Sequence, residues 1–237
     1  MVERSFVKPF SLKKIKKNKN LKYSIILPLD PFGKKEFNLK KCDDCEIFYF
    51  LNFKFILKGK VVIVSPSFGP SQTAFLMECL IESGIKNFIL LGSCASLNGG
   101  RAGDVVIPDK SHSFVSVTKR YIPDRVNFSS SSALNYFLRE KLDKMGVKEI
   151  LGGKIGTVDA VFRETRSFLE SILSKGCSHI DMESAVAFCL GEFYGVRVSS
   201  LLVVLDEIFL RKGKRRVGFL NYFLKMRKVI GIIEKIS

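Results

Sequence analysis

Short apolar runs alternate with amphipathic stretches along the 237 residues of the chain. A short apolar run bounded by turn residues predicts a buried strand, and apolar residues three or four positions apart predict one face of a helix. The pattern predicts a strand pair within residues 46–57 and single strands over 23–29, 60–65, 87–91, 102–108, 150–158 and 197–205. It predicts helices over residues 71–83, 129–146, 165–174, 183–194 and 215–236. A chain of this length can therefore form one large α/β domain with a substantial core.

The last predicted helix has an apolar face. Its apolar residues at helical spacing are Leu220, Phe223, Met226, Ile230 and Ile233. We expect this face to pack on the sheet.

No internal repeat or linker interrupts the pattern, so we expect a single domain over residues 23–237. Residues 1–22 are rich in lysine, which favours a basic N-terminal arm or a short helix. This segment lacks the apolar core of a secretory signal, so none is expected. The apolar runs elsewhere are short and fall between charges, so no membrane span is expected.

Hydrophobic residues make up 46% of the chain, which is typical of a globular protein rather than a disordered one. The six cysteines are scattered, and Cys42 and Cys45 form the only CxxC pair. A metal or redox interpretation needs a second pair or a thioredoxin-like context. We therefore expect reduced thiols, a cytoplasmic location and no metal.

The net charge is +16, with basic clusters at residues 8–22 and 211–216. Such clusters can bind nucleic acid or another polyanion electrostatically. No recognisable nucleic-acid module accompanies them, which favours a lysine-rich solvated surface and makes nucleic acid an unexpected partner.

Carboxylates stand at two places where ligands commonly bind. Asp181 and Glu183 lie at the start of a predicted helix, and Asp206 follows the predicted strand 197–205. In α/β sheets the carboxyl ends of the strands form the rim at which ligands bind. Glu183 has an alternative interpretation as a simple helix cap, because a helix N-terminus favours negative charge.

The run Asp181-Met182-Glu183-Ser184-Ala185, followed by Leu201-Leu202-Val203-Val204-Leu205-Asp206, resembles the signature of the nucleoside phosphorylase superfamily. That superfamily comprises purine nucleoside phosphorylase, uridine phosphorylase and related nucleosidases. The resemblance implies a single-domain three-layer α/β/α fold with a mixed central sheet, and a homo-oligomer that is a dimer or a hexamer. It also implies that Met182 and Glu183 bind the ribose and that Asp206 serves purine chemistry.

Two further segments are similar to one branch of the superfamily. Gly92 to Leu97 resembles a loop in which Gly92 and Ser93 would contact phosphate or sugar. Asp159 to Thr165 resembles a segment in which Phe162 would pack on the base. Phe162 is equally interpretable as an ordinary core residue in a chain with 21 phenylalanines.

The chemistry that the resemblance implies needs no cofactor, only phosphate as co-substrate. Cleaving a nucleoside builds positive charge on the ribose, which Glu183 would stabilise. Asp206 would donate a proton or a hydrogen bond to N7 of a purine.

The chain departs from the superfamily where phosphate ligands are expected. Leu29, Gly33 and Leu90 stand at those positions, and Ala95 and Leu205 replace other common residues. Three interpretations stay open. The first is a phosphorylase (a pentosyltransferase) with a variant phosphate site, and the second is a hydrolytic nucleosidase with Asp30 as the base. The third is a non-catalytic relative that binds a nucleoside or a polyanion.

Overall fold

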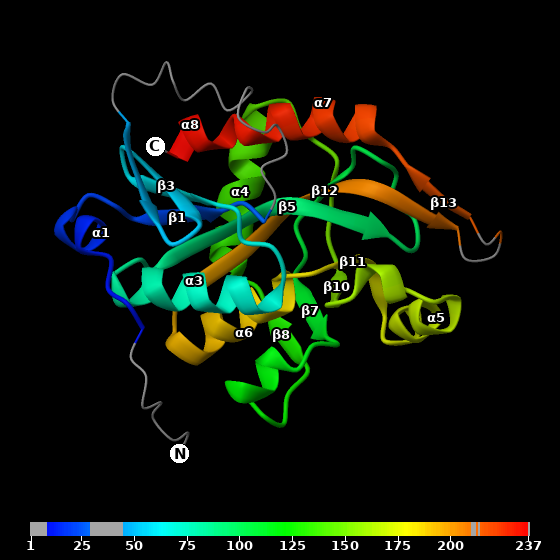
Figure 1. Cartoon of the computed structure of the whole chain (residues 1–237). Coiled ribbons are helices and arrows are strands. Elements are labelled where there is room, and N and C mark those ends of the chain that lie inside the picture. Colours follow the sequence, from blue (N-terminus) through cyan, green and yellow to red (C-terminus); the bar gives the residue numbers. More distant parts are fainter. Residues whose placement is uncertain (1–8, 29–44, 210–211, 213, 237) are drawn as a thin grey trace.

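The computed structural model describes residues 9–28, 45–209, 212 and 214–236. The chain folds around one mixed sheet with helices on both faces, as Figure 1 shows. The strands are β1 Tyr23–Ile26, β2 Glu46–Phe50, β3 Phe53–Lys58, β4 Val61–Ser65, β5 Asn87–Ser96, β6 Val105–Val106, β7 Lys110–Ser113, β8 Asn127–Ser129, β9 Ile150–Leu151, β10 Lys154–Thr157, β11 Cys177–Asp181, β12 Arg197–Phe209 and β13 Lys214–Val217. The helices are α1 Lys13–Lys17, α3 Pro70–Glu82, α4 Ser132–Lys144, α5 Arg166–Ser174, α6 Ser184–Tyr194, α7 Phe219–Ile230 and α8 Ile232–Ile236, with 3-10 turns η2 Val117–Arg120 and η3 Val161–Arg163.

The sheet runs in the order β2-β3-β4-β1-β5-β11-β10-β7-β8, and β12 pairs with β5, β6 and β13. Helices α3 and α6 contribute apolar residues to the core on one face. Helices α4, α7 and α8 do the same on the other face. The predicted three-layer α/β/α fold with a mixed sheet is therefore confirmed.

Strands β5 and β12 form the centre of the sheet. They pair in parallel from Arg197 opposite Asn87 to Val204 opposite Cys94. Both strands are buried almost throughout, since helices cover both faces of the sheet. Their carboxyl ends consequently meet at one place on the rim.

A β-bulge interrupts this pairing beside Leu205. Val204 pairs with Cys94 and Asp206 pairs with the next residue, Ala95, so Leu205 has no partner on β5. A bulge bends its strand and re-aims the side chains that follow it. The prediction that the strand stops at Leu205 was wrong, because β13 pairs antiparallel with β12 and extends it to Phe209.

Several other boundaries differ from the sequence prediction. The segment Gly92–Ser96, expected as a loop, continues β5 because it pairs with β12 and, at its end, with β11. The single strand expected over 150–158 is two strands, β9 and β10, with Gly153 between them at a positive φ of 93°.

The C-terminal segment packs through a different face from the predicted one. Residues 214–217 form β13, so the helix begins only at Phe219. The residues of α7 that are buried against the sheet are Tyr222, Met226 and Val229, whereas Leu220 is 72% exposed. Of the predicted face, Met226 is buried and Ile230 is partly buried against the same core cluster.

The described part of the predicted N-terminal arm lies against the domain. Leu12, Ile15 and Leu21 are buried in the core cluster that contains α3 and α6. The amide of Leu12 also donates a hydrogen bond of 2.8 Å to Ser83 Oγ at the end of α3. The boundary between residues 1–22 and 23–237 stays a prediction.

Cys45 is disulfide-bonded, so the prediction of reduced thiols throughout is wrong at this position. Among the described residues, the free cysteines are Cys79, Cys94, Cys177 and Cys189. None of the helices in the described part of the chain has the length and apolar character needed to cross a membrane.

Candidate active site

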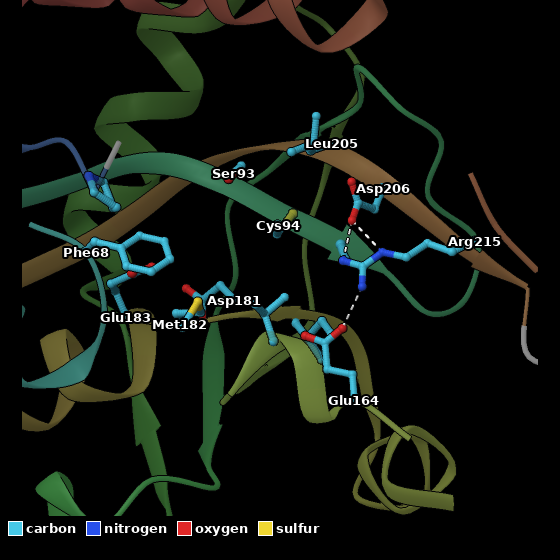
Figure 2. A pocket seen from close by; sticks show the side chains of 14 residues that line it. Phe68, Ser93, Cys94, Glu164, Asp181, Met182, Glu183, Leu205, Asp206 and Arg215 are labelled. Carbon is cyan, nitrogen blue, oxygen red and sulfur yellow. Dashed lines mark hydrogen bonds and ion pairs between the residues drawn. The ribbon is translucent and has the colours of Figure 1, made fainter. Parts of the chain in front are cut away.

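A cavity of about 180 Å³ lies beside the carboxyl ends of β5 and β12 and the start of α6, as Figure 2 shows. Its lining residues are Pro28, Phe68, Ser93, Cys94, Ala95, Val161, Glu164, Ile180, Asp181, Met182, Glu183, Leu205, Asp206 and Arg215. Glu183 and Met182 lie near Phe68 on one side, and Asp206, Arg215 and Glu164 lie on the other. The cavity therefore brings together the two acidic segments that the sequence predicts.

Glu183 immediately precedes α6 but does not cap it. Its side chain makes no hydrogen bond to the helix N-terminus, and Asp181 Oδ2 instead accepts from the Ser184 amide at 2.9 Å. Glu183 Oε1 accepts a hydrogen bond of 2.7 Å from the amide of Gly69 in the turn before α3. The capping interpretation thus applies to Asp181, and the Glu183 carboxyl faces the cavity.

Asp181 is held rigidly beneath the cavity. Thr157 Oγ1 donates a hydrogen bond of 2.6 Å to Asp181 Oδ1, and the same hydroxyl oxygen accepts a bond of 2.8 Å from the Ala185 amide. Burial raises the pKa of Asp181, while the hydrogen bonds from Ser184 and Thr157 lower it. This network ties β10, β11 and α6 together below the Glu183 carboxyl.

The Glu183 carboxyl favours its protonated form. Burial and the nearby Asp181 charge raise its pKa from the ordinary 4.5 to about 8, although the hydrogen bond from Gly69 acts in the opposite direction. A buried carboxyl beside another carboxylate gains little solvation from water and is repelled when charged. Burial and the Asp181 charge therefore both favour the protonated form of Glu183 near neutral pH.

Asp206 and Glu164 share the guanidinium of Arg215 on β13. Arg215 Nε donates a hydrogen bond of 2.6 Å to Asp206 Oδ2, and Nη2 also pairs with this oxygen. Arg215 Nη1 donates a hydrogen bond of 2.9 Å to Glu164 Oε2. The other carboxylate oxygen of Asp206, Oδ1, is buried and has no hydrogen-bond partner within the described chain. One oxygen of Asp206 is thus anchored by Arg215, and the other is left unpaired.

Burial raises the pKa of Glu164, whereas the charge and hydrogen bond of Arg215 lower it and the charge of Asp206 raises it. The Glu164 side chain is only 5% exposed. The sequence analysis assigned no role to Glu164 or Arg215. Glu164 belongs to the segment 159–165 that resembles the superfamily, but Arg215 was one of several cations in the basic cluster 211–216.

Ser93 and Met182, which were predicted to contact sugar or phosphate, line the cavity. Gly92, the residue before Ser93, is not among the lining residues. A Cβ at Gly92 would approach the Pro28 ring at 3.3 Å, so this position requires a small residue for backbone packing. The predicted roles of Ser93, Met182 and Gly92 in binding stay predictions.

The structure does not bring Phe162 to the cavity. Its side chain is 98% exposed, and the preceding residue, Val161, lines the cavity instead. Residues 161–163 form a 3-10 turn, in which successive side chains point about 120° apart. A contact between Phe162 and a base therefore stays a prediction without support from the geometry of this chain.

Three backbone amides of the turn before α3 are already engaged. The amide of Ser67 donates to Leu27 O at 3.1 Å, that of Phe68 to Gln72 Oε1 at 3.0 Å, and that of Gly69 to Glu183. Leu90, at a position where the superfamily has an arginine, is 1% exposed in the core. Leu29, Asp30 and Gly33 lie outside the described residues.

Carboxyl groups dominate the cavity. Four carboxyl side chains line it, and Arg215 is the only cationic side chain among the described lining residues. In the described part of the chain, no group of three or more His, Cys, Asp or Glu side chains is placed to hold a metal ion. The predictions that the protein uses no metal and no cofactor remain untested.

Comparison with known proteins connects this geometry to a family. The sequence profile of the phosphorylase superfamily matches residues 46–219. A purine nucleoside phosphorylase of the DeoD type from Bacillus cereus is 28% identical over 196 residues, which cover 78% of this chain and 82% of the relative. The homologous enzyme of Bacillus mycoides matches with the same identity and coverage.

Two solved structures share the fold. The AMP nucleosidase from Bacteroides thetaiotaomicron superposes with a TM-score of 0.68 at 18% identity, covering 90% of this chain and 89% of that protein. A protein from Weissella paramesenteroides, described as a methylthioadenosine nucleosidase, superposes with a TM-score of 0.73 at 19% identity, covering 92% of this chain and 98% of that protein.

Proposed function

The chain belongs to the phosphorylase superfamily, and from that premise we propose that it cleaves the N-glycosidic bond of a purine nucleoside. One observation carries the proposal: Glu183 and Asp206 line the same cavity from opposite sides. A ribose between them would have its hydroxyls at Glu183 and its base at Asp206. We propose that the enzyme is a phosphorylase that releases the free base and ribose 1-phosphate.

At the sugar end, Glu183 binds the ribose hydroxyls and Met182 packs against the ring. The bond between C1′ and N9 breaks with its electron pair moving to the base, which leaves positive charge on the sugar. A carboxyl group whose interaction with the sugar strengthens as that charge develops lowers the barrier. The Gly69 amide keeps Glu183 Oε1 in place during this change.

At the base end, Asp206 acts on N7 of the purine. Arg215 anchors Asp206 Oδ2, which leaves Oδ1 to transfer a proton to N7 as the electron pair arrives at the base. An oxygen of the attacking group bonds to C1′ in the same reaction. The proton on N7 and the new C1′–O bond balance the broken C1′–N9 bond.

Phosphate is the proposed attacking group. The DeoD-type relatives are purine nucleoside phosphorylases by name, and the Ser93 hydroxyl lines the cavity beside β12. The protein would thus use phosphate as co-substrate, with no cofactor.

Hydrolysis is the second candidate, and the charge of the cavity favours it. A phosphate dianion would meet four carboxyl groups, and the one cation among the described lining residues already pairs with two of them. The two solved structures of the same fold are nucleosidases by description. A water molecule would then attack C1′.

We also propose a homo-oligomer, either a dimer or a hexamer, as the family resemblance implies. The exposed Phe162 beside the cavity, together with Leu220 and Leu224 on α7, offers apolar surface for such contacts. A cytoplasmic location stays part of the proposal: four described cysteines are free, as in a reducing compartment, whereas the disulfide at Cys45 argues against it.

The test is release of free base from inosine, guanosine, adenosine, methylthioadenosine and uridine, each with and without phosphate. The phosphorylase proposal expects release from purine nucleosides only with phosphate, and loss of release in Glu183→Ala. Equal release with and without phosphate would overturn the phosphorylase proposal and support the nucleosidase proposal. No release under either condition would overturn both and leave a binding protein.

A further inference from the structure

Glu164 stands at the base end of the cavity with no assigned part in the reaction, and its contacts suggest one. It comes from the loop after η3, whereas Asp206 and Arg215 come from the β12–β13 hairpin. Arg215 contacts both carboxylates at once. The Glu164 side chain is 5% exposed and the Asp206 side chain is 10% exposed. Figure 2 shows the guanidinium between them.

Glu164, Asp206 and Arg215 form a cluster of two acidic side chains and one basic side chain. If Arg215 paired with Asp206 alone, its whole charge would act on Asp206 and favour the carboxylate, which cannot donate a proton. Glu164 accepts a hydrogen bond from Nη1 of the same guanidinium and places a second negative charge beside it. A cluster of two acids and one cation retains a proton more readily than one acid and one cation.

We propose that Glu164 is a positioning residue that offsets the charge of Arg215, so that Asp206 can hold the proton that the leaving purine needs. This proposal rests on the proposed cleavage of purine nucleosides. Glu164 itself touches no reacting atom in this scheme and acts through Arg215.

The surroundings of Glu164 support this assignment. Its charged neighbours are Arg215 on β13 and Asp206 on β12, and the other titratable groups that line the cavity are Cys94 on β5, Asp181 on β11 and Glu183 before α6. Another ion pair in this part of the chain, between Arg166 and Glu170 on α5, is 64% and 51% exposed and lies in water. Water screens that pair, whereas the buried carboxylate of Glu164 acts on its partner with little screening.

The test compares two substrates that differ in their need for a proton. Inosine needs a proton or a hydrogen bond at N7 to release hypoxanthine. In 7-methylinosine the imidazole ring already carries a positive charge and N7 is blocked, so the base leaves without protonation. A residue that only supports the fold affects both substrates equally, but a residue that serves the proton affects inosine alone.

The informative variant is Glu164→Gln, which keeps an oxygen that accepts from Arg215 and removes the charge. We expect kcat for inosine to fall about tenfold or more, a part of the usual effect of general acid catalysis. The value for 7-methylinosine should stay within about twofold of wild type. Glu170→Gln is the matched control, because it makes the same exchange in the exposed pair, and it should change neither substrate.

A second measurement applies if wild type does not accept 7-methylinosine. It is kcat for inosine in Asp206→Asn, alone and combined with Glu164→Gln. Because Glu164 acts through Asp206 in this scheme, Glu164→Gln should slow the enzyme that has Asp206 and should have little further effect in Asp206→Asn. Glu170→Gln should have no effect in either background.

Equal losses for both substrates, or no loss for either, would overturn the role of Glu164 while leaving the proposed function intact. If the losses in kcat from Glu164→Gln and from Asp206→Asn multiply in the double variant, the role of Glu164 is likewise overturned. Wild type that cleaves neither inosine nor any other nucleoside would instead overturn the proposed function, and with it this inference.

Discussion

The backbone amide of Gly69 donates a hydrogen bond of 2.7 Å to Oε1 of Glu183, which lies 114 residues further along the chain. This bond fixes the carboxyl at the proposed sugar end of the cavity and also occupies an amide that would otherwise be free to bind an anion. The turn before α3 consequently serves Glu183 rather than a phosphate.

Replacing Glu183 by glutamine should reduce base release by about 10²-fold or more, because the amide keeps the hydrogen bond from Gly69 but cannot become negative as the sugar gains charge. Glu192→Gln on α6 is the control, since Glu192 pairs with Arg125 outside the cavity. Steady-state rates with the best purine nucleoside measure the effect. A Glu183→Gln enzyme with near wild-type kcat would contradict the role given to this carboxyl.

Stability should depend on pH through Glu183. Its pKa is about 8 in the folded protein and 4.5 ordinarily, so the folded state binds the extra proton between these values. The unfolded state binds fewer protons in this window, so the free energy of unfolding falls as the pH rises from about 4.5 to about 8. Below the window the contribution of this group is constant.

Glu183→Gln cannot ionise and should lose this dependence. Between pH 5 and pH 8 the Tm of wild type should therefore fall by more than about 3 °C relative to the Tm of Glu183→Gln. Thermal unfolding of both proteins across this range measures the difference. Parallel curves for the two proteins would show that Glu183 titrates normally.

Thr157 should contribute to stability through its hydroxyl. Thr157→Val keeps the shape but leaves Asp181 Oδ1 and the Ala185 amide without the partner they have now. A buried polar group left unsatisfied costs about 1–3 kcal/mol. Thr157→Ser retains the hydroxyl and is the control. Denaturant unfolding measures both, and equal losses in the two variants would assign the effect to the methyl group.

Gly218 joins β13 to α7 and should tolerate no side chain. A Cβ at this position would overlap the side chain of Ala102, and the Gly218 amide donates a hydrogen bond of 2.9 Å to Leu205 O. Gly218→Ala should destabilise the protein by about 1–3 kcal/mol. It should also lower activity, because the displaced hairpin carries Arg215.

Ala102→Gly supplies the matching test of that clash. Combined with Gly218→Ala, it removes the overlapping methyl group and should restore part of the lost stability and activity. The double-mutant cycle isolates the contact between the two positions. Additive losses in the double variant would show that the steric explanation is wrong.

The sequence predicted those features of the fold and site that are local. The alternation of apolar runs predicted the layers. Asp181 and Glu183 could be found because they stand at the end of β11 and just before α6, and Asp206 because it follows the apolar run of β12. Helix α6 follows its prediction closely because its residues from Ser184 to Gly191 are small or apolar and buried, and Gly195 ends it in a left-handed conformation.

The features that the sequence missed depend on distant contacts. Arg215 and Glu164 are 51 residues apart, and nothing in the sequence of the basic cluster 211–216 indicates that Arg215 pairs with Glu164. The pairing of β13 with β12 decides this, and it also explains why the strand continues past Asp206. The sequence favoured Phe162 as the residue that packs on the base, because it is the aromatic residue of a segment that resembles the superfamily. The 3-10 turn places Val161 at the cavity instead.

The excess of carboxyl groups around the cavity should favour a positively charged ligand shaped like a nucleoside. A sugar analogue with a protonated amine in place of the ring oxygen would meet Glu183, whose pKa is about 8, and would draw the proton from it. Binding such a compound at neutral pH would release a proton to the solution. Its heat of binding would then vary with the ionisation enthalpy of the buffer, and its affinity would rise with pH as long as the amine stayed charged.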